Sequence, residues 1–356
     1  MMGARIKQAR IAAGFSLRDL AEKTNHFVTA QAIHKYELGM SAPGSDVLIR
    51  LSKALGVKIE FFFRPLREQI SLGEPVYRKK SSLSKKQIDS IQARVRDSLE
   101  KYLEVEGYFG EHRFSRFELP PDKERKIRSM NDIERFSREL RRKWALGIDP
   151  VQRLTEVLED RGVKVVTLDA ERDFDGLSCW ANETIPVIVV RNTQESDRMR
   201  LSLAHELGHL LMDLSPSLNP EKAAHRFAGA FLVPEEVVRA ELGNSRNRFS
   251  SFELLTLREK YGMSVQAWIF RAYDLNIISH SFLVQLIRFL KSKGLYDKEL
   301  GTKLPREEPA RFKRLVVQAV EEKLISPAKG AEMLDISLNE LRTMLEVGAL
   351  SEEPHS

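Results

Sequence analysis

The sequence has almost no cysteine and no long apolar run, and both absences narrow what the chain can be. A single cysteine, Cys179, among 356 residues rules out an intramolecular disulfide and a cysteine-rich zinc cluster. No apolar run approaches the roughly 18 residues that span a bilayer, and the N-terminus shows no hydrophobic region of a signal peptide. We therefore expect a cytoplasmic protein without a membrane partner.

The composition is that of a globular protein with several domains. A length of 356 residues suffices for two or three domains, and 42% hydrophobic with 30% charged residues is typical of a soluble fold. The net charge of +6 is compatible with a nucleic-acid partner, although an excess of this size is often only a solvated surface.

Residues 4–66 contain short helical patterns that are broken at regular intervals. Ser16 and Asp19 give a capping-box-like start to one of these helices, and Gly56 closes the last. We expect helices over 4–13, 17–23, 29–36 and 45–55, with the run 59–63 completing a small core. Two short helices joined by a tight turn, the second polar on its outer side, predict a helix-turn-helix domain.

The order of residues in this segment resembles the Xre/Cro family of bacterial and phage repressors. The motifs that carry the resemblance are Ile6-Lys-Gln-Ala-Arg10, Gly14-Phe-Ser16, Leu20-Ala21-Glu-Lys, Ala32-Ile33-His-Lys-Tyr36-Glu37-x-Gly39 and Leu51-x-x-Ala54-Leu55-Gly56. The resemblance implies a double-stranded DNA operator, with phosphates held by Ser16 and Arg18. It also implies a recognition helix that presents to the major groove Thr29, Ala30, Gln31, His34 and Lys35. The alternative is a domain of this shape that serves only for protein docking or dimerisation.

Residues 67–130 form a linker with basic clusters. Its stretch 84–105 has helical spacing and is expected to be one long helix that packs on a neighbour or on its twin in a homodimer. The basic residues are Arg78–Lys80, Lys85, Lys86, Arg94 and Arg96. One interpretation is that they contact DNA phosphates beside the operator. The interpretation we prefer is that they belong to a solvated surface.

Residues 203–212 read Leu-Ala-His-Glu-Leu-Gly-His-Leu-Leu-Met. His205 and His209 are four residues apart, so on a helix both imidazoles point from one face and can share a metal ion. Glu206 is placed to take a proton from a metal-bound water. This is the H-E-x-x-H arrangement of zinc peptidases, in which Zn²⁺ is the cofactor and the glutamate is the general base. Gly208 would allow close packing beside the site.

A catalytic zinc site needs a third protein ligand. A histidine six residues after the motif is excluded, because Ser215 occupies that position. Asn219-Pro220 is a good start for a following helix, and Glu221 would lie in its first turn on the apolar stripe, where a carboxylate is costly without a partner. Glu221 is therefore the preferred third ligand. His225 and Asp213 remain rival ligands.

Further motifs resemble the ImmA/IrrE-type metallopeptidases over residues 130–280. They are Trp144-x-x-Gly147-x-Asp-Pro150, Asp197-Arg-x-Arg200-x-x-Leu-Ala-His-Glu-Leu-Gly-His209, Glu221-Lys-x-Ala-x-Arg-Phe-Ala228-x-x-Phe-Leu-x-Pro234 and Tyr261-Gly-x-Ser264-x-x-Ala267. The resemblance implies an intracellular zinc protease that cleaves an Xre-type repressor. One departure is His225, since asparagine is usual before Arg226, and it keeps a metal or substrate role for His225 open.

The core is expected to be a zincin-like α+β fold. The patterns predict helices over 132–146 and 151–161, then strands over 163–168, 176–180 and 187–190 that form a small antiparallel sheet. The motif helix would be capped by Ser196 or Asp197. Residues 281–356 are helical by pattern, and 325–341 suggest helix, turn and helix with Ser337 as N-cap. A second DNA contact and a dimerisation element are equally compatible with that pattern.

The sequence thus predicts a multidomain protein with an all-α helix-turn-helix domain (1–66), a basic helical linker (67–130), a metallopeptidase domain (131–280) and a helical C-terminal region (281–356). We expect a DNA-binding transcriptional regulator that is also a zinc endopeptidase for a specific protein partner, a repressor or an antitoxin. The alternative function is non-catalytic: a repressor or antitoxin whose zincin-like domain senses a ligand or binds a partner toxin.

Overall fold

The computed structural model describes most of the chain, over residues 2–65, 70–74, 83–110, 113–114, 116–170, 174–192, 195–296 and 301–349. The chain divides into two compact units. The first, here called the helical unit, comprises Met1–Leu72, Ser81–Glu111 and Val316–Ser356; the second, here called the mixed unit, comprises Gly73–Lys80 and His112–Leu315. The basic cluster Arg78–Lys80 lies outside the described residues. The three boundaries between the four segments drawn from the sequence stay a prediction.

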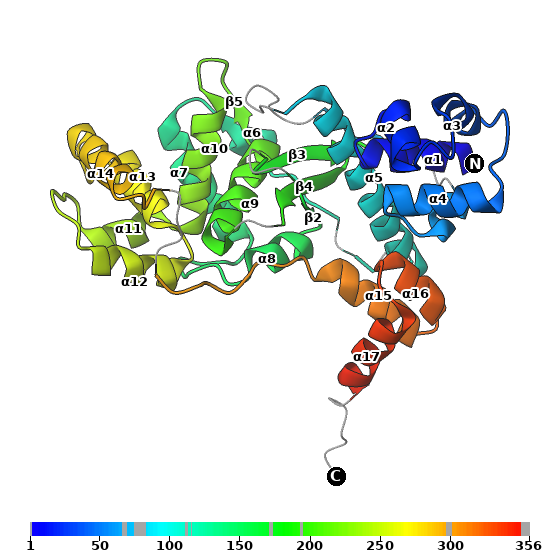
Figure 1. Cartoon of the computed structure of the whole chain (residues 1–356). Coiled ribbons are helices and arrows are strands. Elements are labelled where there is room, and N and C mark those ends of the chain that lie inside the picture. Colours follow the sequence, from blue (N-terminus) through cyan, green and yellow to red (C-terminus); the bar gives the residue numbers. More distant parts are fainter. Residues whose placement is uncertain are drawn as a thin grey trace, which may run out of the picture. The chain divides into compact units, whose positions relative to one another are not determined.

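The helical unit begins with helices that follow the predicted order (Figure 1). They are α1 (Met2–Ala12), α2 (Leu17–Lys23), α3 (Ala30–Glu37), α4 (Ser45–Leu55) and the 3-10 helix η1 (Ile59–Phe63). Ser16 and Asp19 form the capping box of α2, and Gly56, with a φ of 66°, ends α4 in the left-handed conformation. Their apolar faces meet in one core that includes Ile6, Leu20, Ile33, Leu51 and Phe62. The predicted helix-turn-helix arrangement is confirmed.

The longest helix of the described residues, α5 (Lys85–Tyr108), also belongs to the helical unit. Ser84 and Gln87 form its capping box. The unit is completed by the later part of α15 (Arg311–Glu321), by α16 (Pro327–Met333) and by α17 (Leu338–Ala349). Ser337 caps α17 as predicted, because its hydroxyl accepts a hydrogen bond from the backbone of Glu340. In the described part of the chain, no helix is both long and apolar enough to cross a membrane.

The mixed unit combines helices with two small sheets (Figure 1). Its elements before the motif helix are α6 (Asp122–Arg125), β1 (Lys126–Ile127), α7 (Met130–Lys143), α8 (Leu154–Asp160), β2 (Lys164–Leu168), β3 (Gly176–Ala181) and β4 (Ile185–Arg191). They are followed by α9 (Ser196–Leu211), β5 (Asp213–Leu214), α10 (Pro220–Leu232), α11 (Glu235–Leu242), α12 (Ser251–Tyr261), α13 (Val265–Asp274) and α14 (His280–Ser292). The α+β class expected for this part of the chain is confirmed.

The three-stranded sheet differs from the predicted antiparallel one. Its order is β2-β4-β3, with β3 antiparallel and β2 parallel to β4. The expectation was wrong for β2 because β3 and β4 form a hairpin, and β2 lies on the far side of β4 instead of beside β3. In this strand order β3 is an edge strand, and it contacts α9.

A segment of irregular structure links α14 to α15, so the expectation that 281–356 is helical was wrong for 303–310. Pro305 and Pro309 disfavour a helix there. Glu307 instead accepts hydrogen bonds from the backbone N–H groups of Leu154 and Thr155, each at 3.0 Å, and thereby caps α8. Glu307 thereby holds this segment against the start of α8, although its two partners lie 153 and 152 residues earlier in the chain.

Candidate metal centre and nucleic-acid interface

The two histidines of the motif project from α9, a helix that is buried on nearly all sides. Leu203, Leu207 and Leu210 pack into the main core of the mixed unit, which holds the helix in place. The predicted cap was wrong, because the N-cap position is Glu195 and neither Ser196 nor Asp197 occupies it. Asp197 is instead buried and paired with Arg258 of α12 at 2.9 Å, since a buried carboxylate is stabilised more by a guanidinium than by a helix end.

The following helix, α10, begins as the sequence predicts. Asn219 accepts a hydrogen bond from the backbone of Lys222, and Pro220 occupies the first turn. The first turn also carries Glu221, whose carboxylate oxygens lie 3.6 Å from His205 Nε2 and 3.5 Å from His209 Nε2. The structure therefore brings the three predicted metal ligands together.

The geometry of these three side chains fits a zinc ion. The two Nε2 atoms are 3.0 Å apart, and one ligand atom from each residue lies within 4.8 Å of the others. Two ligands of a tetrahedral zinc at bond lengths of 2.0–2.1 Å are about 3.3 Å apart, so the observed separations bracket the required one. Two imidazoles and a carboxylate, with a fourth position left over, are the donor set of a catalytic zinc site.

The rival ligands lie less favourably. Asp213 is an exposed residue of β5 and is not grouped with the two histidines. His225 is exposed on α10, but its ring centroid is 4.3 Å from that of His205. His225 therefore borders the three-residue group without being part of it.

Glu206 is buried beside the two histidines. Its Oε2 accepts a hydrogen bond of 2.8 Å from the hydroxyl of Ser178 on β3. Burial raises the pKa of Glu206 to about 7, against the lowering influence of His205 and of Ser178. By contrast, hydrogen bonding to His205 and His209 lowers the pKa of Glu221 below its usual range. The pKa values of these two carboxyls are thus shifted in opposite directions, which suits Glu206 for proton transfer and Glu221 for metal binding.

Two glycines leave room for this arrangement. A Cβ atom at Gly208 would lie 2.8 Å from Cδ1 of Phe227, so the close contact of α9 with α10 requires glycine, as predicted. A Cβ at Gly176 would lie 3.2 Å from Cγ of Glu206. The sequence analysis missed Gly176 and Ser178; alternation along the strand places both on one face, but only the fold shows that this face meets Glu206.

A buried ion-pair cluster holds α10 from the other side. Glu134 of α7 accepts two hydrogen bonds from Arg271 of α13, at 2.6 and 2.7 Å, and one of 3.0 Å from Arg226 of α10. Although burial raises the pKa of Glu134, the bonds from Arg271 outweigh it, so the pKa is lowered and the group is ionised. Arg226 lies five residues after Glu221, and the cluster therefore restricts the helix that carries the third ligand.

In the helical unit, the six candidate DNA-contacting residues belong to α2 and α3 or to the N-cap positions of these helices. All six are exposed: Ser16, Arg18, Thr29, Gln31, His34 and Lys35. The third helix begins one residue later than expected, because Thr29 is its N-cap and accepts a hydrogen bond from Ala32 at 3.2 Å. Ala30, expected to face the groove, is half-buried.

Comparison with known proteins identifies both parts of the chain. Residues 6–62 match the helix-turn-helix family, and residues 158–273 match the IrrE N-terminal-like domain of a metallopeptidase family. A relative from Bacillus subtilis (strain 168), an SPbeta prophage-derived uncharacterized HTH-type transcriptional regulator named YonR, is 34% identical over 74 residues. That match covers 21% of this chain and 67% of the relative.

The chain belongs to the helix-turn-helix family of transcriptional regulators. It is a regulator of the Xre type that also carries an IrrE N-terminal-like metallopeptidase domain. The six candidate DNA contacts lie inside the matched helix-turn-helix segment, and His205, Glu206, His209 and Glu221 lie inside the matched peptidase segment.

Proposed function

We propose that this DNA-binding regulator is also a zinc endopeptidase that cleaves one specific protein partner, a repressor or an antitoxin. The observation that carries the proposal is the grouping of His205, His209 and Glu221, with Glu206 buried next to them. A zinc ion held by these ligands would supply Lewis acidity, which lowers the pKa of water and polarises a peptide carbonyl.

The protein side of the chemistry follows from the positions of the side chains. Glu206, with a pKa of about 7, can accept a proton at its carboxylate and return it to the amine of the cleaved peptide at neutral pH. Ser178 donates to Oε2 and so fixes the orientation of the carboxylate.

The pairing of a peptidase with a DNA-binding domain suggests how the substrate is selected. If regulator and substrate bind the same DNA, their effective concentration rises without a deep specificity pocket. We therefore propose weak or no activity on casein and generic peptides, and faster cleavage of a repressor-like partner in the presence of operator DNA. We further propose a homodimer on a palindromic operator, as two-fold symmetric sites are usual for helix-turn-helix proteins.

A second function is non-catalytic: a repressor or antitoxin whose zincin-like domain senses a ligand or binds a toxin. The exposed ring of His225 favours this second function, because it lies beside His205 and offers a ligand a contact next to the candidate metal site. The metal ligands do not separate the two functions, since both need them.

Glu206→Gln separates them. We expect this variant to keep its zinc and its DNA affinity and to lose cleavage of the partner encoded next to it by about 100- to 10,000-fold, the usual share of a general base. Glu139→Gln, which changes a half-exposed glutamate of α7, is the matched control. Full biological activity of Glu206→Gln would favour the non-catalytic function. The same variant, used as a substrate trap in a pull-down, would identify the partner.

A further inference from the structure

The long helix α5 carries its charges asymmetrically. Its first half is mainly basic, with Lys85, Lys86, Arg94 and Arg96, and its second half is mainly acidic, with Asp97, Glu100, Glu104 and Glu106. The two halves therefore suit different partners within the helical unit.

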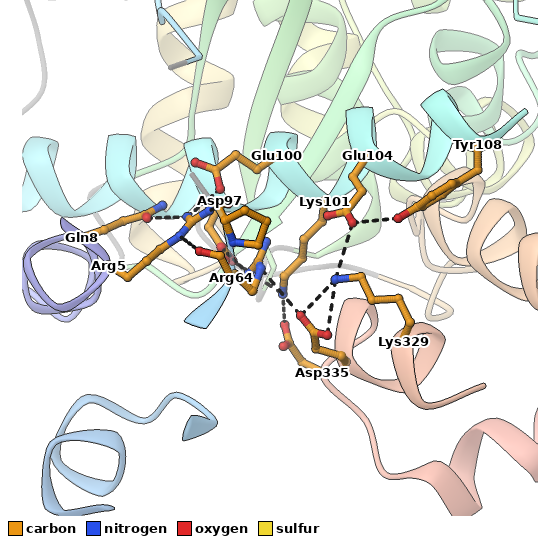
Figure 2. A network of polar contacts seen from close by, with 12 residues as sticks. Arg5, Gln8, Arg64, Asp97, Glu100, Lys101, Glu104, Tyr108, Lys329 and Asp335 are labelled. Carbon is orange, nitrogen blue, oxygen red and sulfur yellow. Dashed lines mark hydrogen bonds and ion pairs between the residues drawn. The ribbon is translucent and has the colours of Figure 1, made fainter. Parts of the chain in front are cut away.

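The acidic half binds basic side chains from both ends of the chain (Figure 2). Arg5 of α1 is 1% exposed and lies 2.6 Å from Glu100, while Arg64, after η1, lies 2.9 Å from Asp97. From α16, Lys329 approaches Glu104 at 3.5 Å. Ion pairs as buried as that of Arg5 are costly to break, so α5 is held firmly against the helix-turn-helix domain.

The basic half continues along that domain towards α2. Ser90 donates a hydrogen bond to the carbonyl of Ala12, the last residue of α1. One turn earlier, Lys86 forms an ion pair of 2.8 Å with Asp19. The start of α5 is thus placed beside the start of α2.

Without a basic partner, the carboxylate of Asp19 would be unfavourable next to DNA. Its Oδ2 accepts a hydrogen bond from the backbone of Ser16, and Arg18 is the preceding residue, so its charge lies among the groups expected to hold a phosphate. The hydrogen bond from Lys86 lowers the pKa of Asp19, and the carboxylate is therefore ionised at neutral pH. A bare carboxylate here would repel the phosphate that Ser16 and Arg18 attract.

We propose that α5 is part of the DNA-binding surface, and that Lys86 neutralises Asp19 so that a backbone phosphate of double-stranded DNA can lie against the side chains of Ser16 and Arg18. This inference rests on the proposed role of Ser16 and Arg18. It extends the DNA-binding surface beyond the helix-turn-helix domain to a helix that follows it in sequence.

The test uses the full chain and a fluorescently labelled DNA duplex of mixed sequence, because phosphate contacts do not depend on sequence. The variants are Lys86→Gln, Asp19→Asn and their combination, and asparagine retains an acceptor for the cap of α2. Lys260→Gln is the matched control, since Lys260 is 54% exposed against 59% for Lys86 and pairs at 2.7 Å with Glu241 in the mixed unit.

We expect Lys86→Gln to weaken binding by about threefold or more at low salt and to flatten the salt dependence of the affinity by up to about one unit of logarithmic slope. The double variant should bind as Asp19→Asn does, because without the carboxylate Lys86 has nothing to neutralise. Binding by Lys86→Gln equal to that of the control, or an equal loss with and without Asp19→Asn, overturns the inference. If the unmodified chain binds no duplex at low salt, the proposed DNA binding fails as well.

Discussion

The candidate metal centre and the candidate DNA-contacting surface use polar side chains in opposite ways. At the metal centre, His205, Glu206 and His209 are 9%, 8% and 5% exposed, and a partner from another element meets each carboxylate. On the helical unit the corresponding side chains all face solvent. Buried polar groups depend on one another because each lost partner leaves an unsatisfied group, whereas exposed groups act almost independently and are screened by salt. Substitutions of the buried polar groups in the mixed unit should therefore have large effects, and those on the DNA-contacting surface should have small, additive ones.

The largest effect is expected at the metal ligands. The purified protein should hold about one zinc per chain, and His205→Ala, His209→Ala or Glu221→Ala should each weaken zinc binding by more than about 100-fold, because the site loses one of three protein ligands. Metal analysis after dialysis measures this, with His225→Asn as the control that keeps its zinc. Full occupancy in Glu221→Ala would remove Glu221 from the site and make His225 the third ligand.

A buried structural charge should come next. Glu307 is 5% exposed, pairs with Arg200 and caps α8. Glu307→Ala therefore leaves the buried guanidinium of Arg200 without its carboxylate partner and removes the acceptor of two backbone N–H groups. We expect the free energy of unfolding to fall by about 3–5 kcal/mol. All three tryptophans, Trp144, Trp180 and Trp268, lie in the mixed unit, so tryptophan fluorescence during denaturation reports on that unit. The exposed neighbour Glu308 provides the control; an equal loss in Glu308→Ala would refute the role of burial.

The pH dependence of stability offers a smaller test. Glu159 is buried, and burial raises its pKa from 4.5 to about 7, although the backbone N–H groups of Ala310 and Arg311 donate to Oε2. A raised pKa contributes stability that is present below about pH 4.5 and is lost as the pH rises through about 7, by up to about 3 kcal/mol. The side chain of Glu159→Gln cannot ionise, so this variant should not lose that stability. Its free energy of unfolding, relative to that of the unmodified chain, should therefore be higher at about pH 8 than at about pH 5. Denaturation at both pH values, with Glu156→Gln on the same helix as control, measures the difference; parallel curves for all three proteins would contradict it.

The smallest effects belong to the exposed surface. Arg18→Ala should weaken binding to all DNA sequences alike and flatten the salt dependence, because a phosphate contact carries no sequence information. Gln31→Ala should instead relax base preference at one position, at a cost of about 1–3 kcal/mol on the preferred sequence. Affinity measurements on an operator and on a mixed duplex at several salt concentrations distinguish the two. A strong, sequence-specific loss in Arg18→Ala would reverse the assigned roles.

Features that depend on near neighbours in the chain were predictable. The capping box at Ser16, the N-cap at Asn219 and the left-handed end at Gly56 follow from hydrogen bonds and backbone freedom within one helical turn. The i, i+4 spacing of His205 and His209 places both rings on one face of any helix. The same local reasoning placed Glu221 in the first turn of α10, where the structure has it.

Contacts between distant parts of the chain could be decided only by the tertiary structure. Periodicity shows which face of an element is apolar, but it contains no information on which other element meets that face. Ser178 therefore became visible as a partner of Glu206, 28 residues away, only once β3 lay at the edge of the sheet beside α9. Glu307 likewise caps α8 across more than 150 residues, and Lys86 reaches Asp19 across 67. Each of these pairs forms because packing brings remote segments together. A buried charge is stable only beside a partner, and the tertiary structure decides which residues are near enough to be that partner.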